Sequence, residues 1–267
     1  MKTLIIYGEM WGWVNFNDTI LLPHLKNKID NIKVFTETSK LKNYLNNEGK
    51  NNKNYILPLT DTHLNEIHQA NIDTMVPKMD ITNIFSNKQL FAEYVEKNNL
   101  SKHFPKIFTQ PQNSNRLVVV KPKYGGGSSL VYFTELNKLT TKDFVNNTVQ
   151  EYIDSHMEFA GYFVANKGKI IHSFAYFREY PQGKPYIKAV NDKSVQKRTF
   201  IDPTCVGIIE KFISPVSFTG IFCVDYKFTK DTLVVLEINP RCGASLSYPE
   251  NIKDAVDVVS RLLDLHR

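Results

Sequence analysis

The sequence is poor in cysteine and lacks the glycine patterns that mark the common dinucleotide and P-loop sites. Its three cysteines, Cys205, Cys223 and Cys242, are an odd number without C-x-x-C spacing. This argues against a disulfide framework or a structural zinc site and favours a reducing compartment. The first turn after a strand-like run, G-E-M-W-G-W at 8–13, lacks the G-x-G-x-x-G spacing. The pattern therefore gives no support for a nicotinamide cofactor.

Long hydrophobic runs are missing as well. The apolar run at the N-terminus is short and is interrupted at Gly8 and Glu9, so it lacks the apolar region of a signal peptide. No stretch approaches the roughly 20 apolar residues that a transmembrane helix needs. We expect a cytoplasmic protein with no membrane partner.

The charge is only weakly informative. The formal net charge of +6 favours an anionic ligand, but a nucleoside triphosphate satisfies it as well as a nucleic acid does. Because the basic residues are scattered rather than clustered, a nucleic acid is the poorer candidate partner. With 267 residues, of which 42% are hydrophobic, the chain has enough material for one large core or for two to three coupled subdomains.

The first part of the chain alternates strand-like and helix-like segments. Strand-like runs occupy 3–7, 32–36, 55–59 and 72–77, and helical spacing occurs at 20–25, 41–45 and 61–70. Such alternation predicts a small, mostly parallel α/β domain over residues 1–84.

The rest of the chain has an α+β pattern. Ser86 is the expected N-cap of a helix at 87–97. Antiparallel hairpins then dominate, among them one across a Lys-Gly turn at 167–168, and a final helix is expected at 250–265. The fold class is therefore α/β plus α+β. We place the two α+β subdomains at 85–150 and 151–267.

A glycine loop, K-P-K-Y-G-G-G-S-S at 121–129, lies between two β-rich runs. Three consecutive glycines allow backbone conformations closed to other residues, so that successive N–H groups can converge on phosphate oxygens. Lys121 stands at the end of an apolar strand just before the loop and would supply a cation for the phosphates. The alternative interpretation is a plain flexible hairpin beside a solvated lysine.

The segment 220–241, GIFCVDYKFTKDTLVVLEINPR, carries the strongest local signal. If its hairpin turns at 229–231, Asp225 and Glu237 lie opposite each other, and Asn239 projects on the same side as Glu237. Directly opposed Cβ atoms are about 4.5–5.5 Å apart, so two like charges repel unless something neutralises them. The alternative interpretation is an amphipathic hairpin whose wet face is acidic.

Asp225, Glu237 and Asn239 form an oxygen-only ligand set, without Cys or His. Such a set selects a hard cation, and Mg²⁺ usually shares its coordination sphere with substrate phosphates. The hairpin therefore predicts a Mg²⁺ site, with Mn²⁺ as a substitute ion.

A succession of motifs links these features. They are Asn87-Lys88 at a helix start, V-V-V-Lys121-Pro before the glycines, Gln150-Glu151-Tyr152-Ile153, Glu158, Gly220 followed by Asp225, and Glu237-Ile-Asn239-Pro-Arg241. This order resembles the ATP-grasp superfamily, in particular its carboxylate–amine ligase and carbamoyl-phosphate-synthetase-like branch. The resemblance covers roughly residues 85–245, and E-I-N-P-R is its most specific motif. It implies the ATP-grasp fold, with ATP between the two α+β subdomains and domain 1–84 helping to form the substrate site.

The resemblance also assigns roles position by position. ATP would be contacted by Lys88, Lys121, the loop residues Gly125, Gly126, Gly127 and Ser128, the hinge residues Gln150, Glu151, Tyr152 and Ile153, and Glu158 at the ribose. Asp225, Glu237 and Asn239 would bind Mg²⁺. Arg241 would face either the transferred phosphoryl group or the substrate carboxylate, because its planar fork suits both anions.

The resemblance also implies a further basic catalytic residue on the middle strands. Arg178, Lys188, Lys197 and Arg198 compete for this role, and Arg178 ranks first because it lies in the strand-like run SFAYFREY. A solvated surface charge is the alternative interpretation of Arg178.

The implied function is a Mg²⁺-ATP-dependent ligase that activates a carboxylate as an acyl phosphate for attack by an amine or another nucleophile. The substrates would be small molecules such as amino acids, peptides or metabolites. A small-molecule kinase or a nucleotide-binding sensor is the alternative. If the chain forms oligomers, a homodimer is the commonest assembly to expect.

Two other groups of residues allow more than one interpretation. Trp11, Trp13 and Phe16 follow the first strand and would line an acceptor pocket or form an interdomain core contact. Cys242 follows Arg241 and has no neighbouring His in sequence. We therefore interpret it as a small packing residue rather than a nucleophile.

Overall fold

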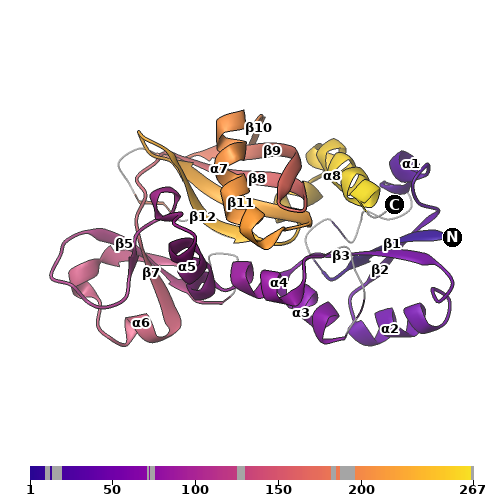
Figure 1. Cartoon of the computed structure of the whole chain (residues 1–267), viewed down its shortest axis with the longest axis horizontal. Coiled ribbons are helices and arrows are strands. Elements are labelled where there is room, and N and C mark those ends of the chain that lie inside the picture. The colour runs from indigo at the N-terminus through magenta and orange to yellow at the C-terminus, as the bar shows by residue number, and fades with distance from the viewer. Residues whose placement is uncertain are drawn as a thin grey trace.

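The computed structural model describes residues 1–9, 13, 20–70, 72, 76–124, 130–181, 185–186 and 196–265. Three sheets lie in a row along the molecule (Figure 1). The N-terminal sheet lies at one end, a four-stranded sheet lies at the other, and a five-stranded sheet stands between them. Both ends of the chain lie beside the N-terminal sheet. Within the described residues, no helix is long and apolar enough to span a membrane.

The N-terminal sheet is parallel, with the strand order β2-β1-β3. Its elements are β1 (Lys2–Tyr7), α1 (Leu22–Leu25), β2 (Asn31–Phe35), α2 (Thr38–Asn46), β3 (Lys53–Pro58) and α3 (Asp61–Gln69). This confirms the predicted alternation of strands and helices. The fourth predicted strand, at 72–77, falls largely on residues 73–75, outside the described residues.

The four-stranded sheet is antiparallel, with the order β4-β7-β5-β6. Its elements are β4 (Ile107–Phe108), β5 (Leu117–Pro122), β6 (Tyr132–Glu135), α6 (Asp143–Asn146) and β7 (Asn147–Glu151). One face buries Val118, Val120 and Val149 in a core of its own. Lys121 therefore points to the opposite face, because side chains alternate along a strand. The glycine loop joins β5 to β6, and its residues 125–129 lie outside the described residues.

The five-stranded sheet has the order β10-β9-β8-β11-β12 and is antiparallel throughout. Its strands are β8 (Met157–Asn166), β9 (Lys169–Glu179), β10 (Lys197–Thr199), β11 (Gly220–Phe228) and β12 (Leu233–Asn239). The β8–β9 turn contains Lys167 and Gly168 with φ of 50° and 81°. Positive φ at both central residues is the geometry of a tight hairpin turn that matches the strand twist, and it confirms the predicted Lys-Gly turn.

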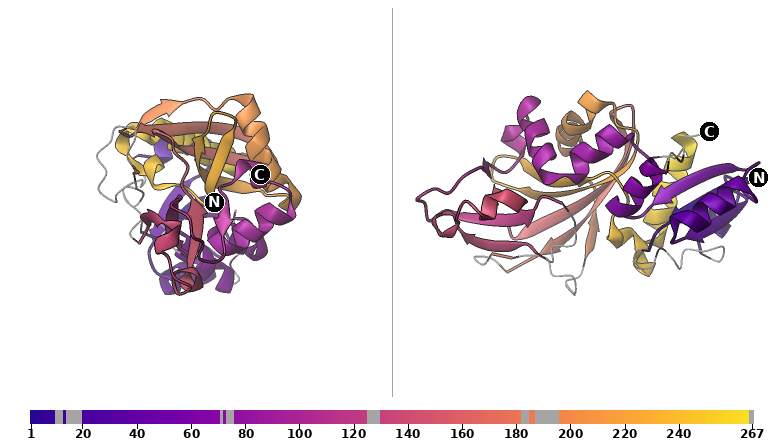
Figure 2. Two further views of the ribbon diagram at one scale, coloured as in Figure 1. Left: turned by 90° about the vertical axis from the view of Figure 1, so that its left-hand side faces the viewer. Right: turned by 90° about the horizontal axis from the view of Figure 1, so that it is seen from below.

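Helices cover one face of the five-stranded sheet. They are α4 (Met79–Ser86), α5 (Lys88–Lys97) and α7 (Pro203–Ile213). Figure 2 shows α5 and α7 on the same side of the sheet, where Phe91 and Phe212 share a core with Phe163 and Phe222. Segment 85–104, grouped with the four-stranded subdomain in the predicted boundaries, thus packs on the five-stranded sheet.

The predicted N-cap at Ser86 is wrong by one residue. Asn87 separates α4 from α5 with an extended backbone (φ −104°, ψ 114°), and its side chain accepts hydrogen bonds from the N–H groups of Gln89 and Leu90. Ser86 is instead the last residue of α4, and its hydroxyl donates to Asp61. The two helices meet without a loop between them, so the extended residue alone can act as the cap.

The other face of the five-stranded sheet is covered by α8 (Ile252–Leu265), which the sequence predicted, and by the N-terminal sheet. These three parts share one core, in which Trp13 is fully buried with Leu4, Tyr162 and Val258. Trp13 is therefore an interdomain core contact, while Trp11 and Phe16 lie outside the described residues. Short 3₁₀ helices complete the fold at Ser101–His103, Leu136–Lys138, Ser214–Val216, Ala244–Ser247 and Pro249–Asn251.

Phe222 tests the core beneath the helices. It is fully buried, stacks on Phe163 at a ring distance of 5.0 Å and meets Phe218 edge-on at 5.0 Å. Phe222→Ala should lower the free energy of unfolding by about 3–5 kcal/mol, through lost burial and the cavity left behind. Urea denaturation measures this loss. Val145→Ala is the control, because Val145 is 62% exposed and should change stability by less than about 0.5 kcal/mol.

Candidate active site

The β11–β12 hairpin brings Asp225 and Glu237 directly opposite each other, as predicted. Near the turn, Phe228 pairs with Leu233 and Tyr226 with Val235; the register then shifts between Asp225 and Tyr226. The β-bulge makes Leu236 an extra residue of β12. In a regular strand Glu237 would share the face of Val235, which is fully buried in the core under the helices. The bulge therefore turns Glu237 onto the same face as Asp225.

Two lysines from other elements approach this carboxylate pair. Lys88 is the first residue of α5, and its Nζ lies 3.9 Å from Oε2 of Glu237. Lys121 lies at the end of β5, close enough to interact electrostatically with Glu237, Asp225 and Lys88. Burial lowers the pKa of Lys121, against the attraction of Glu237. The ammonium groups of Lys88 and Lys121 thus neutralise the carboxylates of Asp225 and Glu237, which are partly removed from water.

Electrostatics keep Glu237 ionised. Burial alone would raise its pKa, but Lys88 and Lys121 outweigh this effect, and hydrogen bonds with Asp225 and Asn239 act in the same direction, so the pKa is lowered. Nδ2 of Asn239 lies 3.3 Å from Oε1 of Glu237. An ionised carboxylate beside an amide and a second carboxyl group is a suitable donor set for a hard cation.

The donor set fits Mg²⁺ only in combination with a ligand. Asp225, Glu237 and Asn239 would hold the ion. Within the described part of the chain, no cluster of three or more His, Cys, Asp or Glu side chains is arranged to hold a metal. Two carboxylates and one amide leave octahedral positions open, which phosphates and water fill in Mg²⁺-nucleotide sites.

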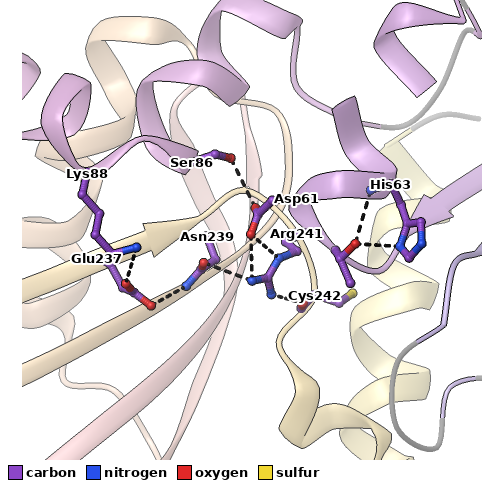
Figure 3. Close-up of polar contacts among 9 residues, drawn as sticks. Asp61, His63, Ser86, Lys88, Glu237, Asn239, Arg241 and Cys242 are labelled. Carbon is purple, nitrogen blue, oxygen red and sulfur yellow. Dashed lines mark hydrogen bonds and ion pairs between the residues drawn. The ribbon is translucent and has the colours of Figure 1, made fainter. Parts of the chain in front are cut away.

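Arg241 lies next to this set and is held on several sides (Figure 3). Its Nε and Nη2 donate to Oδ2 of Asp61 at 3.2 and 3.0 Å, and Nη2 also donates to Oδ1 of Asn239 at 3.2 Å. Nη1 donates to the carbonyl oxygen of Cys242 at 3.1 Å. Burial acts to lower the pKa of Arg241, but the Asp61 carboxylate outweighs burial and raises it. In the structure Arg241 is thus already paired with Asp61, and its role toward a substrate anion stays a prediction.

The predicted hinge lies on β7 and the residues after it. Gln150 is only 3% exposed and pairs with Val119, on the face that carries Lys121. The Glu151 side chain points the other way and forms an ion pair with Arg116 at 3.3 Å. Any contact of Glu151 with a ligand on the Lys121 face would thus come from its backbone. Its N–H already donates to the carbonyl oxygen of Lys106.

Tyr152 and Ile153 complete the predicted hinge. Tyr152 meets the ring of Phe133 edge-on at 5.2 Å, and Nζ of Lys227 stands 5.4 Å from the centre of its ring. Ile153 comes next and is half-buried. The hinge thus presents the aromatic ring of Tyr152 toward Lys227.

Arg178, Glu158 and Lys227 form a row across β9, β8 and β11. Glu158 is paired with Arg178 across the sheet, and its Oε2 lies 3.6 Å from Nζ of Lys227. Arg178 and Lys227 are 7% and 5% exposed, and Nε of Arg178 has no hydrogen-bond partner. A buried guanidinium with an unused donor, beside a buried ammonium, is a suitable place for an anion.

The other basic candidates point elsewhere. Lys197 forms an ion pair with Glu179 at 3.3 Å on the surface, and Arg198 donates to Asp254 of α8. Lys188 lies outside the described residues, as do Gly125, Gly126, Gly127 and Ser128 of the glycine loop. Arg178 is the candidate that lies in line with Glu158.

Two residues of the site were missed from the sequence. Lys227 could have been found, because it stands two positions after Asp225 on the same strand and so shares its face. Asp61 could not, because nothing in the sequence places the start of α3 beside Arg241, which is 180 positions later.

Comparisons with known proteins agree with this geometry. A family model for the ATP-grasp domain matches residues 85–245, which is more than half of the chain. The chain therefore belongs to the ATP-grasp family. A search of curated proteins gave no significant match.

Solved structures show the same fold at low sequence identity. An L-amino acid ligase from Bacillus licheniformis is 14% identical with a TM-score of 0.67, covering 98% of this chain and 74% of its own. A D-alanine–D-alanine ligase from Bacillus anthracis is 16% identical with a TM-score of 0.62, covering 99% and 95%. D-cycloserine synthetase DcsG is 12% identical with a TM-score of 0.66, covering 98% and 99%. All three span nearly the whole of this chain, including its N-terminal domain.

Thiol chemistry tests the interpretation of Cys242. Its side chain is fully buried, and burial raises its pKa to about 12. Cys223 is also buried, whereas Cys205 is only half-buried. A thiol-specific reagent such as DTNB should react slowly with Cys205 in the native protein and with all three thiols only after unfolding. Cys205→Ser should abolish the native reaction. Rapid modification of Cys242 would contradict its role as a packing residue.

Proposed function

We propose that this chain is a Mg²⁺-ATP-dependent ligase that joins a small-molecule carboxylate to an amine or another nucleophile. The observation that carries the proposal is the opposed pair Asp225 and Glu237, faced by Lys88 and Lys121. Two carboxylates suit a divalent cation, and two ammonium groups suit the phosphates that the cation would bridge. The bound ion would neutralise charge that develops on the transferred phosphoryl group.

The chain's own residues would position the reactants. Lys88 and Lys121 would hold the triphosphate, and the hinge residues Gln150 and Tyr152 would contact the adenine. Arg178 offers its unused Nε to an anion. Catalysis of phosphoryl transfer consists mainly of such positioning and charge stabilisation, because the protein itself makes no covalent bond.

The reaction would proceed in two balanced steps. The substrate carboxylate attacks the γ-phosphorus of ATP, which forms an acyl phosphate and releases ADP. The amine nitrogen then attacks the acyl carbon, the bond from that carbon to the phosphate oxygen breaks, and the nitrogen loses a proton. The products are an amide, ADP and inorganic phosphate.

The names of the similar structures support an amino acid as the first substrate class to examine. They are ligases or synthetases of L-amino acids, D-alanine and D-cycloserine. Their folds span the N-terminal domain of this chain as well as the ATP-grasp domain. The proposed substrates are accordingly small amino acids or close analogues, bound near the junction of the two.

Hydroxylamine trapping tests the reaction. The enzyme is incubated with Mg²⁺, ATP and hydroxylamine over a panel of L- and D-amino acids, short peptides and small carboxylates. We expect ADP and a hydroxamate with at least one acid, because hydroxylamine captures an acyl phosphate without the natural nucleophile. A phosphorylated product without hydroxamate would show a kinase instead. ATP binding without turnover across the panel would favour a nucleotide sensor.

Glu237→Gln tests the cation site within that reaction. The substitution keeps the size of the side chain and removes the charge that faces Lys88. Mg²⁺-dependent formation of ADP should fall by about 100-fold or more, the size of effect found when one preorganised transition-state contact is lost. Circular dichroism should show the fold retained. Glu48→Gln is the control, because Glu48 is an exposed carboxylate remote from the hairpin. Full activity in Glu237→Gln would remove this residue from the site.

A further inference from the structure

Six side chains at the edge of the site are joined in series by polar contacts, and we call them the polar ring (Figure 3). Its members, in order, are Ser86, Asp61, Arg241, Asn239, Glu237 and Lys88. Ser86 and Lys88 flank the single residue that separates α4 from α5, so the ring closes through the backbone. It joins the start of α3, the α4–α5 junction and the end of β12.

Asp61 is the one member of the polar ring that comes from the N-terminal domain. It precedes the family match at 85–245 and stands at the first residue of α3. The helix does not depend on it as a cap, because Thr60 is the N-cap and accepts the N–H of His63 at 3.2 Å. Both oxygens of Asp61 are used on the ring instead, Oδ1 by the Ser86 hydroxyl at 3.2 Å and Oδ2 by Arg241.

The contacts of Arg241 show what Asp61 does. A guanidinium has five N–H groups. Two of those on Arg241 go to Asp61, one goes to Asn239 and one to the carbonyl oxygen of Cys242. Asp61 therefore fixes the plane of the guanidinium by accepting from its Nε and Nη2 edge. The second N–H of Nη2 is thereby directed at Asn239. Asn239 in turn contacts Glu237. The orientation of two proposed Mg²⁺ ligands is thus linked, through Arg241, to a carboxylate in another domain.

We propose that Asp61 is a positioning residue: it holds Arg241 against Asn239, and thereby makes the N-terminal domain a supporting part of the Mg²⁺-nucleotide site. The inference rests on the proposed function, because it takes Asn239 and Glu237 as ligands of the Mg²⁺ in Mg²⁺-ATP. Side chains that orient metal ligands from outside typically change metal affinity or activity by about 10- to 100-fold when they are lost.

The alternative role for the same contact is that a phosphate of the nucleotide displaces Asp61 from Arg241. The geometry favours a permanent contact. Asp61 is anchored by Ser86 on its other oxygen, and the guanidinium side chain is only 14% exposed. If an anion took its place on Arg241, the partly buried Asp61 carboxylate would lose its cationic partner, which is unfavourable. The two roles predict opposite effects of removing Asp61 on nucleotide affinity, because without Asp61 there is nothing to displace and the nucleotide would bind more tightly.

The test measures nucleotide affinity rather than turnover. Isothermal titration with a non-hydrolysable ATP analogue is carried out in excess Mg²⁺ and again in EDTA. Asp61→Ala should weaken binding by about 10- to 100-fold in Mg²⁺ and leave binding in EDTA unchanged. Asp61→Asn, which keeps the shape of the side chain, and Ser86→Ala, which frees only one oxygen, should show smaller losses in the same direction. A merely structural role would lower both affinities together.

Two controls match Asp61 in kind. Asp264→Asn removes another ion pair that crosses between the N-terminal part and the rest of the chain, the 2.6 Å contact with Lys28. Asp80→Asn removes another acidic residue from a first helical turn, in α4. Neither touches the polar ring, so both should keep the effect of Mg²⁺ on affinity.

A double-mutant cycle with Arg241→Ala decides whether Asp61 acts through Arg241. If it does, Asp61→Ala should have no further effect on Mg²⁺-dependent affinity in the Arg241→Ala background. Additive losses would overturn the inference, and so would tighter binding in Asp61→Ala. If Mg²⁺ fails to strengthen nucleotide binding to the wild-type protein, the proposed cation site is wrong, and this inference is wrong because it depends on that site. If Mg²⁺ acts on the wild type but equally on Asp61→Ala, the inference alone fails.

Discussion

The site depends on two carboxylates held face to face. Asp225 and Glu237 stand on neighbouring strands at directly opposed positions, an arrangement that like charges destabilise unless cations compensate them. Compensation comes from Lys88 at the start of α5 and Lys121 at the end of β5, so two separate elements must converge on the hairpin. The two lysines reach the hairpin because α5 packs on the five-stranded sheet and the four-stranded sheet carries β5 beside it. The same balance of charge is the reason that we propose a divalent cation and a polyphosphate as ligands. The cation would take the place of the ammonium groups beside the carboxylates, and the polyphosphate that of the carboxylates beside the ammonium groups.

The N-terminal domain contributes more than a cover for the sheet. Its core is continuous with that of α8 and the five-stranded sheet, through residues such as Trp13 and Val258. This shared packing fixes the position of α3, and the start of α3 carries Asp61 to Arg241. Apolar burial thus supplies the positional accuracy that the polar ring needs, because a hydrogen bond weakens steeply when its geometry is disturbed.

Much of the fold could be predicted from local pattern. The alternation of apolar runs indicated the parallel sheet, the Lys167-Gly168 turn indicated the β8–β9 hairpin, and the E-I-N-P-R motif indicated the family. Errors occurred where neighbouring elements compete. Ser86 and Asn87 are both good caps by residue type, and only the direct junction of α4 and α5 selects Asn87. Likewise the pairing of Asp225 with Glu237 was predicted from a turn at 229–231. The turn instead spans 229–232, which sets a different register, and the bulge at Leu236 restores the predicted pairing.

The sequence by itself determined which chemical groups are available and which of them share a strand face. Asp225 and Lys227 are two positions apart on one strand, as are Glu237 and Asn239 on the next, and strand alternation places each pair on one side. Only the tertiary structure decided which charges meet across elements: Lys88 with Glu237, Glu158 with Lys227, and Asp61 with Arg241. The physical reason is that alternation is a local property of the backbone, whereas the meeting of distant charges is set by the packing of the cores that carry them.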